Sequence, residues 1–386
     1  MRTEFAGFVR PDGGVGTRNH LLVLSVTGLT GPTARRIGRA IAGAKVVATP
    51  YGSGLLGDDR ALQQRALVGL GSHPNVGATL VIGAHPPQAR EIGAAIARTG
   101  KPVEVLVLDD CGHDALTLTD LGIRAGARLA RELSRARRTT VPAGRLFLGM
   151  ECGRSDPSSG LVANPLVGRV VDALVAAGGK AVFGETIEWL GAEHLLQARA
   201  SDPHVASAIA RAVTERERAA VASGVELLGN NPGPTNIAAG LSTIEEKSLG
   251  AIAKGGTGPI RGVVATAESP SGPGLYVMDA PAYAPESVTG LVAAGAQVVL
   301  FTTGVGNSYV SLLVPTLKIS ANPQAGSRLQ EQLDFDASDV FEARTDVDTA
   351  AGRLHDLVLE VASGTLTWGE ILDEGDEVIS RLGPAL

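Results

Sequence analysis

A regular alternation of short aliphatic runs with longer amphipathic stretches fills the first 140 residues. Runs that are apolar on both faces are typical of buried parallel strands, and the stretches between them have helical spacing. Repeated strand–helix units fold into an open parallel sheet with helices on both faces. Residues 1–140 are therefore expected to form a doubly wound, Rossmann-like α/β domain. Its strands are predicted at residues 21–26, 45–49, 78–82 and 103–108, and its helices at residues 32–42, 58–69, 88–98 and 118–137.

The pattern changes at residues 136–144, a charged and then polar stretch that contains Pro and Gly. Beyond it, strand-like runs alternate with long loops rich in Gly, Pro and Asn, and such loops often carry functional residues. We expect residues 141–386 to form a second, loop-rich α/β domain that holds most of the active-site motifs. Its strands are predicted at residues 146–150, 181–183, 298–302 and 316–319, and its helices at residues 165–177, 187–199, 204–222, 243–253, 287–294 and 350–362.

The charge balance and the apolar runs argue against two classes of partner. With 34 basic and 40 acidic side chains the net charge is −6, so the chain lacks the basic surface that nucleic acids and anionic membranes require. Its apolar runs are far shorter than the roughly 20 residues of a membrane span, and its first residues lack a signal-peptide core. A cytoplasmic protein without nucleic-acid or membrane partners is expected.

Residues 149–156 follow a predicted strand of the second domain and carry several reactive side chains. In open α/β sheets, ligands bind at the carboxyl ends of strands. This arrangement places Glu151, Cys152, Arg154, Ser155 and Asp156 at the carboxyl end of the strand, and we assign Cys152, Arg154, Ser155 and Asp156 to a pocket there. The alternative is a polar turn in which Asp156 caps the next turn and Cys152 packs as a small apolar side chain.

A second group of polar residues indicates either metal binding or acid–base chemistry. Cys111 and Cys152 are the only cysteines, so any metal needs His and carboxylate ligands. If a helix begins near residue 186, Glu185 and Glu188 share its first turn, and Glu193 and His194 lie more than one turn later. These side chains can bind a hard or borderline divalent ion or supply an acid and a base. We take Glu185, Glu188 and His194 as the candidate ligands of such an ion, Fe²⁺, Mn²⁺ or Mg²⁺. Spacing alone favours the ordinary alternative, in which the carboxylates complement the helix dipole and His194 is hydrogen-bonded.

Lysine is rare in this chain, with only six among the 34 basic side chains. Two of them, Lys247 and Lys254, follow a loop rich in Asn, Pro and Gly over residues 230–236. Such a loop can present backbone N–H groups and lysine to a substrate carboxylate. Ser242 and Glu245 fit a capping box at the start of the intervening helix, and Lys254 can cap its end. Capping leaves the loop and Lys247 unexplained.

Two later stretches, FTTGVGN (residues 301–307) and PTLKISAN (residues 315–322), place Thr302, Thr303 and Lys318 in or beside predicted strands. The Gly-x-Gly element is only a weak indication of anion binding, because an ordinary turn produces it equally well. The sequence has neither a phosphate-binding loop nor a complete dinucleotide fingerprint after its first predicted strand. A nucleotide cofactor is therefore not expected.

Taken together, these stretches resemble the altronate/galactarate dehydratase family, including large subunits of the sulfolactate sulfo-lyase type. The resemblance implies a lyase that removes water, or in one branch sulfite, from a 2-hydroxy acid or sugar acid to give a 2-oxo acid, commonly with a ferrous or manganous ion. It also implies a β-clip domain of the SAF type. Because this chain starts at its GTRN region, that domain is expected on a separate small subunit, and we also expect a homo-oligomer. The matching stretches are VGTRNH (15–20), HPNVG (73–77), LGMECGRSDPSSGLVANPLVG (148–168), GETIEWLGAEHLL (184–196), NPGPTNIAAGLSTIEEKSLGAIAKGGTGPI (231–260), GLYVMDAPAYAPESVTG (274–290), FTTGVGN (301–307) and PTLKISAN (315–322).

The chain departs from the family pattern at several positions. The pattern has Cys or His near Leu29, Tyr51 and Leu55, and Gly-Cys-Glu after the third strand, where this chain reads Ala-His-Pro-Pro. These replacements remove the thiols of the usual iron site. His85 and His113 are either replacement ligands or ordinary surface histidines. The family pattern also has Gly at the position of Arg154 and Arg at the position of Val305.

Elimination from a 2-hydroxy acid requires removal of a weakly acidic proton beside a carboxylate, and the resulting dianion needs cationic stabilisation. We assign catalytic roles to Cys152, Asp156, Glu185, Glu188, His194, Lys247 and Lys254. We assign substrate binding to Arg18, Asn19, Arg154, Ser155, Asn164, Asn236, Thr302, Thr303 and Lys318. The alternative is a non-catalytic or scaffold homologue whose metal site has eroded.

Overall fold

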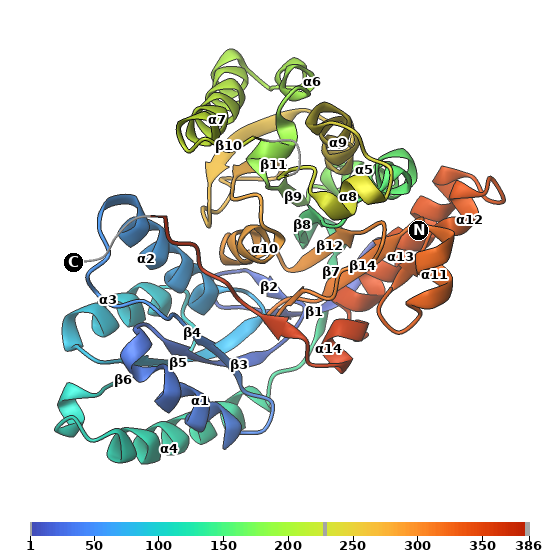
Figure 1. Cartoon of the computed structure of the whole chain (residues 1–386). Coiled ribbons are helices and arrows are strands. Elements are labelled where there is room, and N and C mark those ends of the chain that lie inside the picture. The colour runs from blue at the N-terminus through green and yellow to red at the C-terminus, as the bar shows by residue number, and fades with distance from the viewer. Residues whose placement is uncertain (1, 227–229, 383–386) are drawn as a thin grey trace.

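Four parallel strands near the N-terminus form the sheet that the sequence predicts (Figure 1). In this computed structural model, which describes residues 2–226 and 230–382, the strand order is β4-β3-β5-β6. Alternate side chains of the central strands enter two separate cores, one on each face of the sheet. The doubly wound α/β prediction is therefore confirmed. The strands are β3 (His20–Ser25), β4 (Lys45–Ala48), β5 (Val76–Gly83) and β6 (Val103–Val107); α1 (Gly31–Arg39) and α4 (Ala115–Leu133) cover one face, and α2 (Gly57–Ser72) and α3 (Pro86–Ala97) cover the other.

A second, seven-stranded sheet lies above the first in Figure 1, and all of its strands are parallel. Helices α5, α7 and α13 pack on its outer face, whereas α10 packs between the two sheets and shares a core with α2. In sheet order the strands are β10 (Ile260–Ala265), β11 (Gly274–Asp279), β9 (Lys180–Phe183), β8 (Phe147–Cys152), β12 (Val298–Thr302), β14 (Thr316–Ser320) and β15 (Phe335–Asp336); the helices are α5 (Asn164–Ala176), α7 (Pro203–Ala222), α10 (Ala284–Ala293) and α13 (Val347–Ala362).

One helical stretch, Ser159–Ala176, is long and apolar enough to cross a membrane by composition alone, yet 56% of it is buried inside the protein. It consists of a π-helical turn, η4 (Ser159–Ala163), that continues into α5. Its apolar side chains contribute to the core of the second sheet together with those of α13. Its hydrophobicity is therefore explained by packing.

Segments from both ends of the chain join the two sheets. Strands β1 (Glu4–Val9) and β7 (Thr139–Pro142) pair in a small antiparallel sheet, and Phe5 packs into the core of the second sheet. At the other end, β16 (Gly375–Asp376) pairs with β13 (Val310–Ser311), and Ile379 enters the core shared by α2 and α10. The division of the chain at residue 140 stays a prediction.

The predicted helix over residues 187–199 is wrong. A 3₁₀ turn, η5 (Thr186–Trp189), is followed by a bend, and α6 (Glu193–Ala198) begins afresh. The bend centres on Gly191, whose φ of +83° is in the left-handed region that favours glycine. A Cβ added there would lie 2.5 Å from Cγ of Glu245, so a contact from another helix fixes the break.

The helix that carries Lys247 begins one residue later than its predicted capping box. In α9 (Ile244–Ala251), Thr243 is the N-cap and its Oγ1 accepts the backbone N–H of Glu246 at 3.2 Å. The Glu246 carboxylate in turn accepts the backbone N–H of Ser242 at 2.8 Å. The paired capping interaction thus uses Thr243 and Glu246 in place of Ser242 and Glu245. The helix ends in a 3₁₀ turn, η6 (Ile252–Gly255), which carries Lys254.

Arg18, expected to bind substrate, instead connects the N-terminal part of the chain to its C-terminal helices. Its guanidinium donates to both oxygens of Glu370 at 2.6 and 2.8 Å, and also to three backbone carbonyls. Only 6% of its side chain is exposed. The neighbouring Asn19 is similarly engaged, because it accepts from Arg10 and donates to the carbonyl of Leu133.

We predict that Arg18→Ala lowers the free energy of unfolding by about 3–5 kcal/mol, because it leaves the half-buried Glu370 without its partner. Chemical denaturation followed by circular dichroism measures this change. The control is Arg124→Ala, which removes an exposed pair with Asp120 and should leave stability unchanged within error. Equal effects of the two substitutions would contradict the structural role of Arg18.

Candidate active site

The candidate site lies where two neighbouring parallel strands of the second sheet end. Strand β8 ends at Cys152, and β9 ends two residues before Glu185. Glu185 has φ +59° and ψ +66°, a left-handed conformation that turns the chain into η5 and brings Glu188 toward β8. A non-glycine residue in this region of backbone space is uncommon and often marks a functional site.

Glu188 is the centre of a buried network of charges. One carboxylate oxygen lies 2.7 Å from Nζ of Lys247, and the other lies 3.4 Å from Nζ of Lys254 and 3.1 Å from Sγ of Cys152. Lys254 also donates to Sγ of Cys152 at 3.0 Å. Between 1% and 12% of the side chains of Glu188, Lys247 and Lys254 is exposed, so these charges depend on one another for compensation.

Proton affinities in this network follow from burial and charge. Burial alone would raise the pKa of Glu188, but the ion pairs with Lys247 and Lys254 outweigh it and lower the pKa to about 2. Burial would lower the pKa of Lys254, yet Cys152 and Glu188 raise it. Glu188 is therefore ionised and Lys254 is protonated at neutral pH.

A second group of buried side chains, Glu151, Cys152 and Glu185, adjoins the network. One ligand atom from each lies within 4.8 Å of the others. Burial raises the pKa of both carboxyl groups, and of the Cys152 thiol to about 12, with nearby negative charge adding to the effect on Glu185 and Cys152. Oε2 of Glu151 and Oε2 of Glu185 are buried without a hydrogen-bond partner. Two such oxygens beside a sulfur fit a divalent cation of hard or borderline character.

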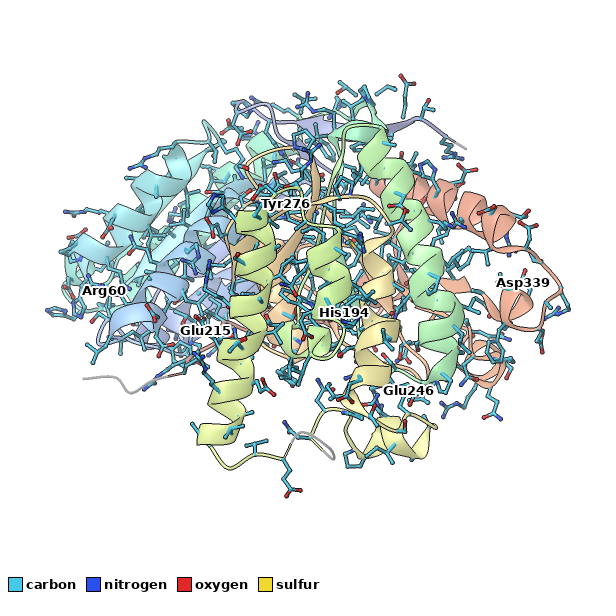
Figure 2. All side chains as sticks on the ribbon, turned by 90° about the horizontal axis from the view of Figure 1, so that it is seen from above. Arg60, His194, Glu215, Glu246, Tyr276 and Asp339 are labelled. Carbon is cyan, nitrogen blue, oxygen red and sulfur yellow. The ribbon has the colours of Figure 1, made fainter. Side chains whose placement is uncertain are left out.

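The predicted metal ligands Glu185, Glu188 and His194 do not come together. His194 is exposed on α6, beyond the bend at Gly191 (Figure 2), so the broken helix separates it from the other two. Both oxygens of Glu188 are already engaged by lysine and thiol. Glu151, which the sequence places at the end of the predicted strand but which received no assigned role, joins Glu185 instead. The signal for it was a carboxylate at the carboxyl end of an otherwise apolar strand.

A cavity of about 710 Å³ opens onto this cluster. Its wall combines the ends of β8 and β9 with the loop at 230–236, the first residues of α10, the loop after β12 and the C-terminal segment. Several predicted site residues meet here although they are distant in sequence. The polar residues that line the cavity are Cys152, Arg154, Glu185, Glu188, Asn230, Asn231, Asn236, Lys247, Tyr283, Asn307, Ser308, Tyr309 and Glu374.

Three other predicted residues line an adjacent, more apolar groove of about 510 Å³, which shares Lys247 with the cavity. Ser155 lies at its edge. Asp156 accepts the backbone N–H of Ser159 at 3.0 Å and the amide of Asn322 at 2.7 Å, as the capping alternative predicts. Asn164 accepts from Thr302 at 2.6 Å, which explains the burial of both side chains. Asp156 and Asn164 therefore stabilise the segment that connects β8 to α5.

Two further predicted residues lie beneath the cavity wall. Thr303 accepts the backbone N–H of Gly306 at 3.1 Å and so shapes the turn after β12. Nζ of Lys318 lies 3.6 Å from the ring centre of Phe301 and donates to the backbone carbonyl of Tyr309. Burial lowers the pKa of Lys318 to about 7. Lys318 therefore holds the Tyr309 loop, and neither side chain lines the cavity.

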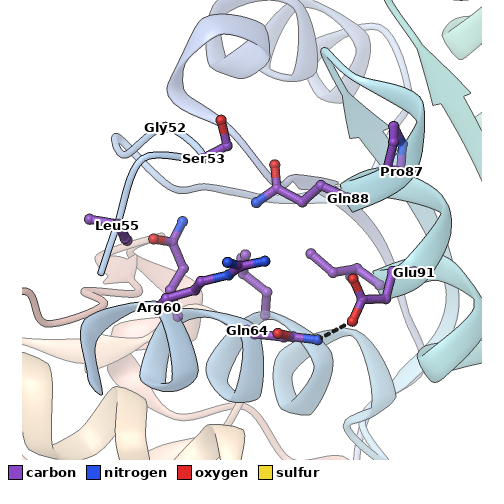
Figure 3. A pocket seen from close by; sticks show the side chains of 11 residues that line it. Gly52, Ser53, Leu55, Arg60, Gln64, Pro87, Gln88 and Glu91 are labelled. Atoms are coloured by element: carbon purple, nitrogen blue, oxygen red, sulfur yellow. Dashed lines mark hydrogen bonds between the residues drawn. The ribbon is translucent and has the colours of Figure 1, made fainter. Parts of the chain in front are cut away.

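A smaller cavity of about 180 Å³ lies between α2 and α3 of the first sheet (Figure 3). It is lined by Leu55 and Pro87, which lie in the two stretches where the family resemblance implies Cys, His or Gly-Cys-Glu in place of this chain's residues. Its polar side chains include Gln64, whose amide donates to Glu91 at 2.6 Å. Among the described residues that line it, none is Cys or His, so this cavity does not fit a thiolate-bound metal.

His85, just before α3, and His113 lie at the surface and do not line this cavity. Nδ1 of His85 is 3.1 Å from one oxygen of Asp109, and Nδ1 of His113 is 3.3 Å from the other. Both imidazoles are more than half exposed. Their pairing with one carboxylate explains their positions without a metal.

Comparison with known proteins gives matches over nearly the whole chain. Residues 143–385 match the C-terminal domain of D-galactarate/altronate dehydratases, and residues 7–135 match the second domain of D-galactarate dehydratase/altronate hydrolase. The (2R)-sulfolactate sulfo-lyase subunit beta of Chromohalobacter salexigens is 36% identical over 98% of this chain and 97% of its own length. The altronate dehydratase of Bacillus subtilis is 31% identical over 99% of this chain and 78% of its own length.

A third relative, the L-threo-forming galactarate dehydratase of Escherichia coli, is 33% identical over 63% of this chain and 46% of its own length. All three relatives are lyases by name. The family resemblance drawn from the sequence motifs is confirmed. The chain therefore belongs to the D-galactarate/altronate dehydratase family.

Proposed function

We propose that this chain is the large subunit of a cytoplasmic lyase that eliminates water or sulfite from a 2-hydroxy acid and gives a 2-oxo acid. The observation that carries this proposal is the buried Glu188 between Lys247 and Lys254, at the wall of a polar cavity. Two lysines held in place by a buried carboxylate suit the stabilisation of a dianionic intermediate. The activities named for the relatives support the same reaction class.

Lys247 and Lys254 have different positions in this chemistry. Lys247 lines the cavity and can contact the substrate carboxylate, and its pKa is raised because the effect of Glu188 outweighs burial. Lys254 lies behind Cys152 and adds positive charge without lining the cavity. Glu188 keeps both ammonium groups in place. The cavity wall is thus electropositive at the point where negative charge develops during removal of the α-proton.

Glu151, Cys152 and Glu185 are the residues that would hold a divalent cation. When bound, such an ion supplies a Lewis acid for the 2-hydroxyl and carboxylate oxygens. Glu185 and Cys152 line the cavity, and Glu151 anchors the group from within β8. Oε1 of Glu151 accepts the backbone N–H of Cys152 at 3.0 Å, which orients its free Oε2.

A non-catalytic scaffold is the second candidate. The small cavity in the first sheet favours it, because Leu55 and Pro87 stand where the family pattern has ligands. The two candidates differ in one measurement, which is turnover of a 2-hydroxy acid by the assembled protein.

We predict that the metal is lost in Glu185→Gln and retained in His194→Ala. Glu185 offers a buried oxygen without a partner, whereas His194 is exposed on a separate helix. Elemental analysis after anaerobic purification, followed by reloading with Fe²⁺, Mn²⁺ or Mg²⁺, measures bound metal in each variant. Loss of metal in His194→Ala would support the trio expected from the sequence, which shares Glu185 with the buried group. Retention of metal by Glu185→Gln would contradict both ligand groups.

We predict that Lys254→Met lowers kcat by roughly 10²–10³-fold, because a preorganised cation facing the developing charge is removed. Lys247 still pairs with Glu188, so the fold should survive. The assay follows formation of the 2-oxo acid from (2R)-sulfolactate, altronate and galactarate. Lys180→Met serves as the control, because Lys180 is a half-buried lysine that donates to the carbonyl of Pro270. An unchanged kcat in folded Lys254→Met would contradict the assigned role.

We predict that turnover requires a separate small subunit of the SAF type. The relative from Chromohalobacter salexigens is named as a subunit, which supports a partner. Co-expression with a small protein encoded beside this chain, followed by affinity purification, should give a complex with activity. Full turnover by the purified chain alone would refute this requirement. The same preparations, analysed by light scattering, test the proposed homo-oligomer.

A further inference from the structure

Arg154 is a cation in the wall of the large cavity, and its side chain forms no ion pair with the described residues of the chain. It follows β8 by two residues, and its side chain is exposed. Lys247, the other cationic side chain lining the cavity, is paired with Glu188 at 2.7 Å. Within the part of the chain that the structure describes, no carboxylate lies within 4.0 Å of the Arg154 guanidinium. The cavity therefore holds one positive charge that the buried network does not use.

The backbone at Arg154 is held in a conformation that suits glycine. Its φ is +55°, in the left-handed region, where a side chain such as arginine is disfavoured. Its carbonyl accepts the backbone N–H groups of Gly304 at 3.2 Å and Val305 at 3.3 Å, so the loop after β12 enforces this conformation. A non-glycine residue kept at such a position beside a cavity is typical of ligand-binding sites.

We propose that Arg154 binds a second anionic group of the substrate, distinct from the carboxylate at the reacting end. This inference rests on the proposed lyase function. In the proposed function the reacting carboxylate contacts Lys247, so the guanidinium of Arg154 in the same cavity is available to another group of the substrate. A guanidinium forms paired hydrogen bonds with planar or tetrahedral oxyanions, whereas a neutral hydroxyl tail leaves its charge uncompensated. The substrate class is thus a 2-hydroxy acid that carries a second carboxylate or a sulfonate.

Binding and kinetics with probes of known charge test this proposal. Malate carries a second carboxylate and 3-sulfolactate carries a sulfonate, while lactate and glycerate carry one anionic group each. In Arg154→Gly we expect Kd for malate or 3-sulfolactate to rise at least roughly tenfold, as expected for the loss of hydrogen bonds to a charged group. Lactate and glycerate should bind within about twofold of the wild-type value, because they lack the second anionic group that Arg154 is proposed to bind. Comparison of malate with 3-sulfolactate identifies which anion the site prefers.

Two further readouts separate a binding role from a structural one. Because glycine tolerates φ +55°, Arg154→Gly should keep or raise Tm, so weaker binding cannot be attributed to unfolding. With the complete enzyme, KM for the doubly charged substrate should rise while kcat stays within about threefold, and Arg154→Lys should restore part of the affinity. Arg124→Ala, an exposed arginine on α4, is the matched control and should change neither value.

The outcomes distinguish this inference from the proposed function. Normal turnover with equal affinity of wild type and Arg154→Gly for malate and 3-sulfolactate would overturn the role of Arg154 alone. Equal loss for singly and doubly charged probes would also overturn it, because Arg154 would then act on the reacting end or on the loop. Selective loss of the doubly charged probes without turnover by the wild-type complex would support the anion site and refute the lyase. Failure of all four probes to bind wild type would overturn the inference about Arg154, whereas turnover of altronate or galactarate by the same preparation decides the lyase function separately.

Discussion

The compensation of one buried carboxylate determines how the site is built. Glu188 lies in a 3₁₀ turn after β9, and its charge can remain there only because two ammonium groups reach it. Lys247 comes from α9 and Lys254 from the turn that ends this helix. Strand β8 contributes the thiol of Cys152 to the same contact. Three segments distant in sequence are thereby held at one point beside the cavity.

The same charge network sets the properties of its neighbours. The ionised Glu188 opposes further negative charge nearby, so it adds to the effect of burial in raising the pKa of Cys152 and of Glu185. Burial raises the pKa of Glu151 as well, so a bound cation would be needed to favour the charged forms of both carboxyls. Buried carboxyl oxygens without hydrogen-bond partners, such as Oε2 of Glu151 and Oε2 of Glu185, are destabilising in a core that serves packing alone. The position of this group beside the cavity wall is consistent with a functional site.

Sequence patterns predicted the parts of this structure that depend on local periodicity. The four strands of the first sheet and their helices follow from apolar runs, and the rarity of lysine singled out Lys247 and Lys254. Features that depend on distant contacts were missed. The bend at Gly191 is fixed by Glu245, and Arg18 is engaged by Glu370 at the other end of the chain. Because the bend separates His194 from Glu185, no local pattern could identify the correct group of ligands.

The two cavities lie on different sheets, and this separation bears on the choice between an enzyme and a scaffold. The small cavity is formed by α2 and α3, whereas the charge network is formed by β8, η5 and α9. Helix α10 packs between the sheets, so substitutions such as those at Leu55 change apolar packing on one side without touching Glu188 on the other. Loss of family ligands in the first sheet therefore does not imply loss of chemistry in the second. The charge network and the unpaired Arg154 persist where a packing role alone would favour neutral side chains.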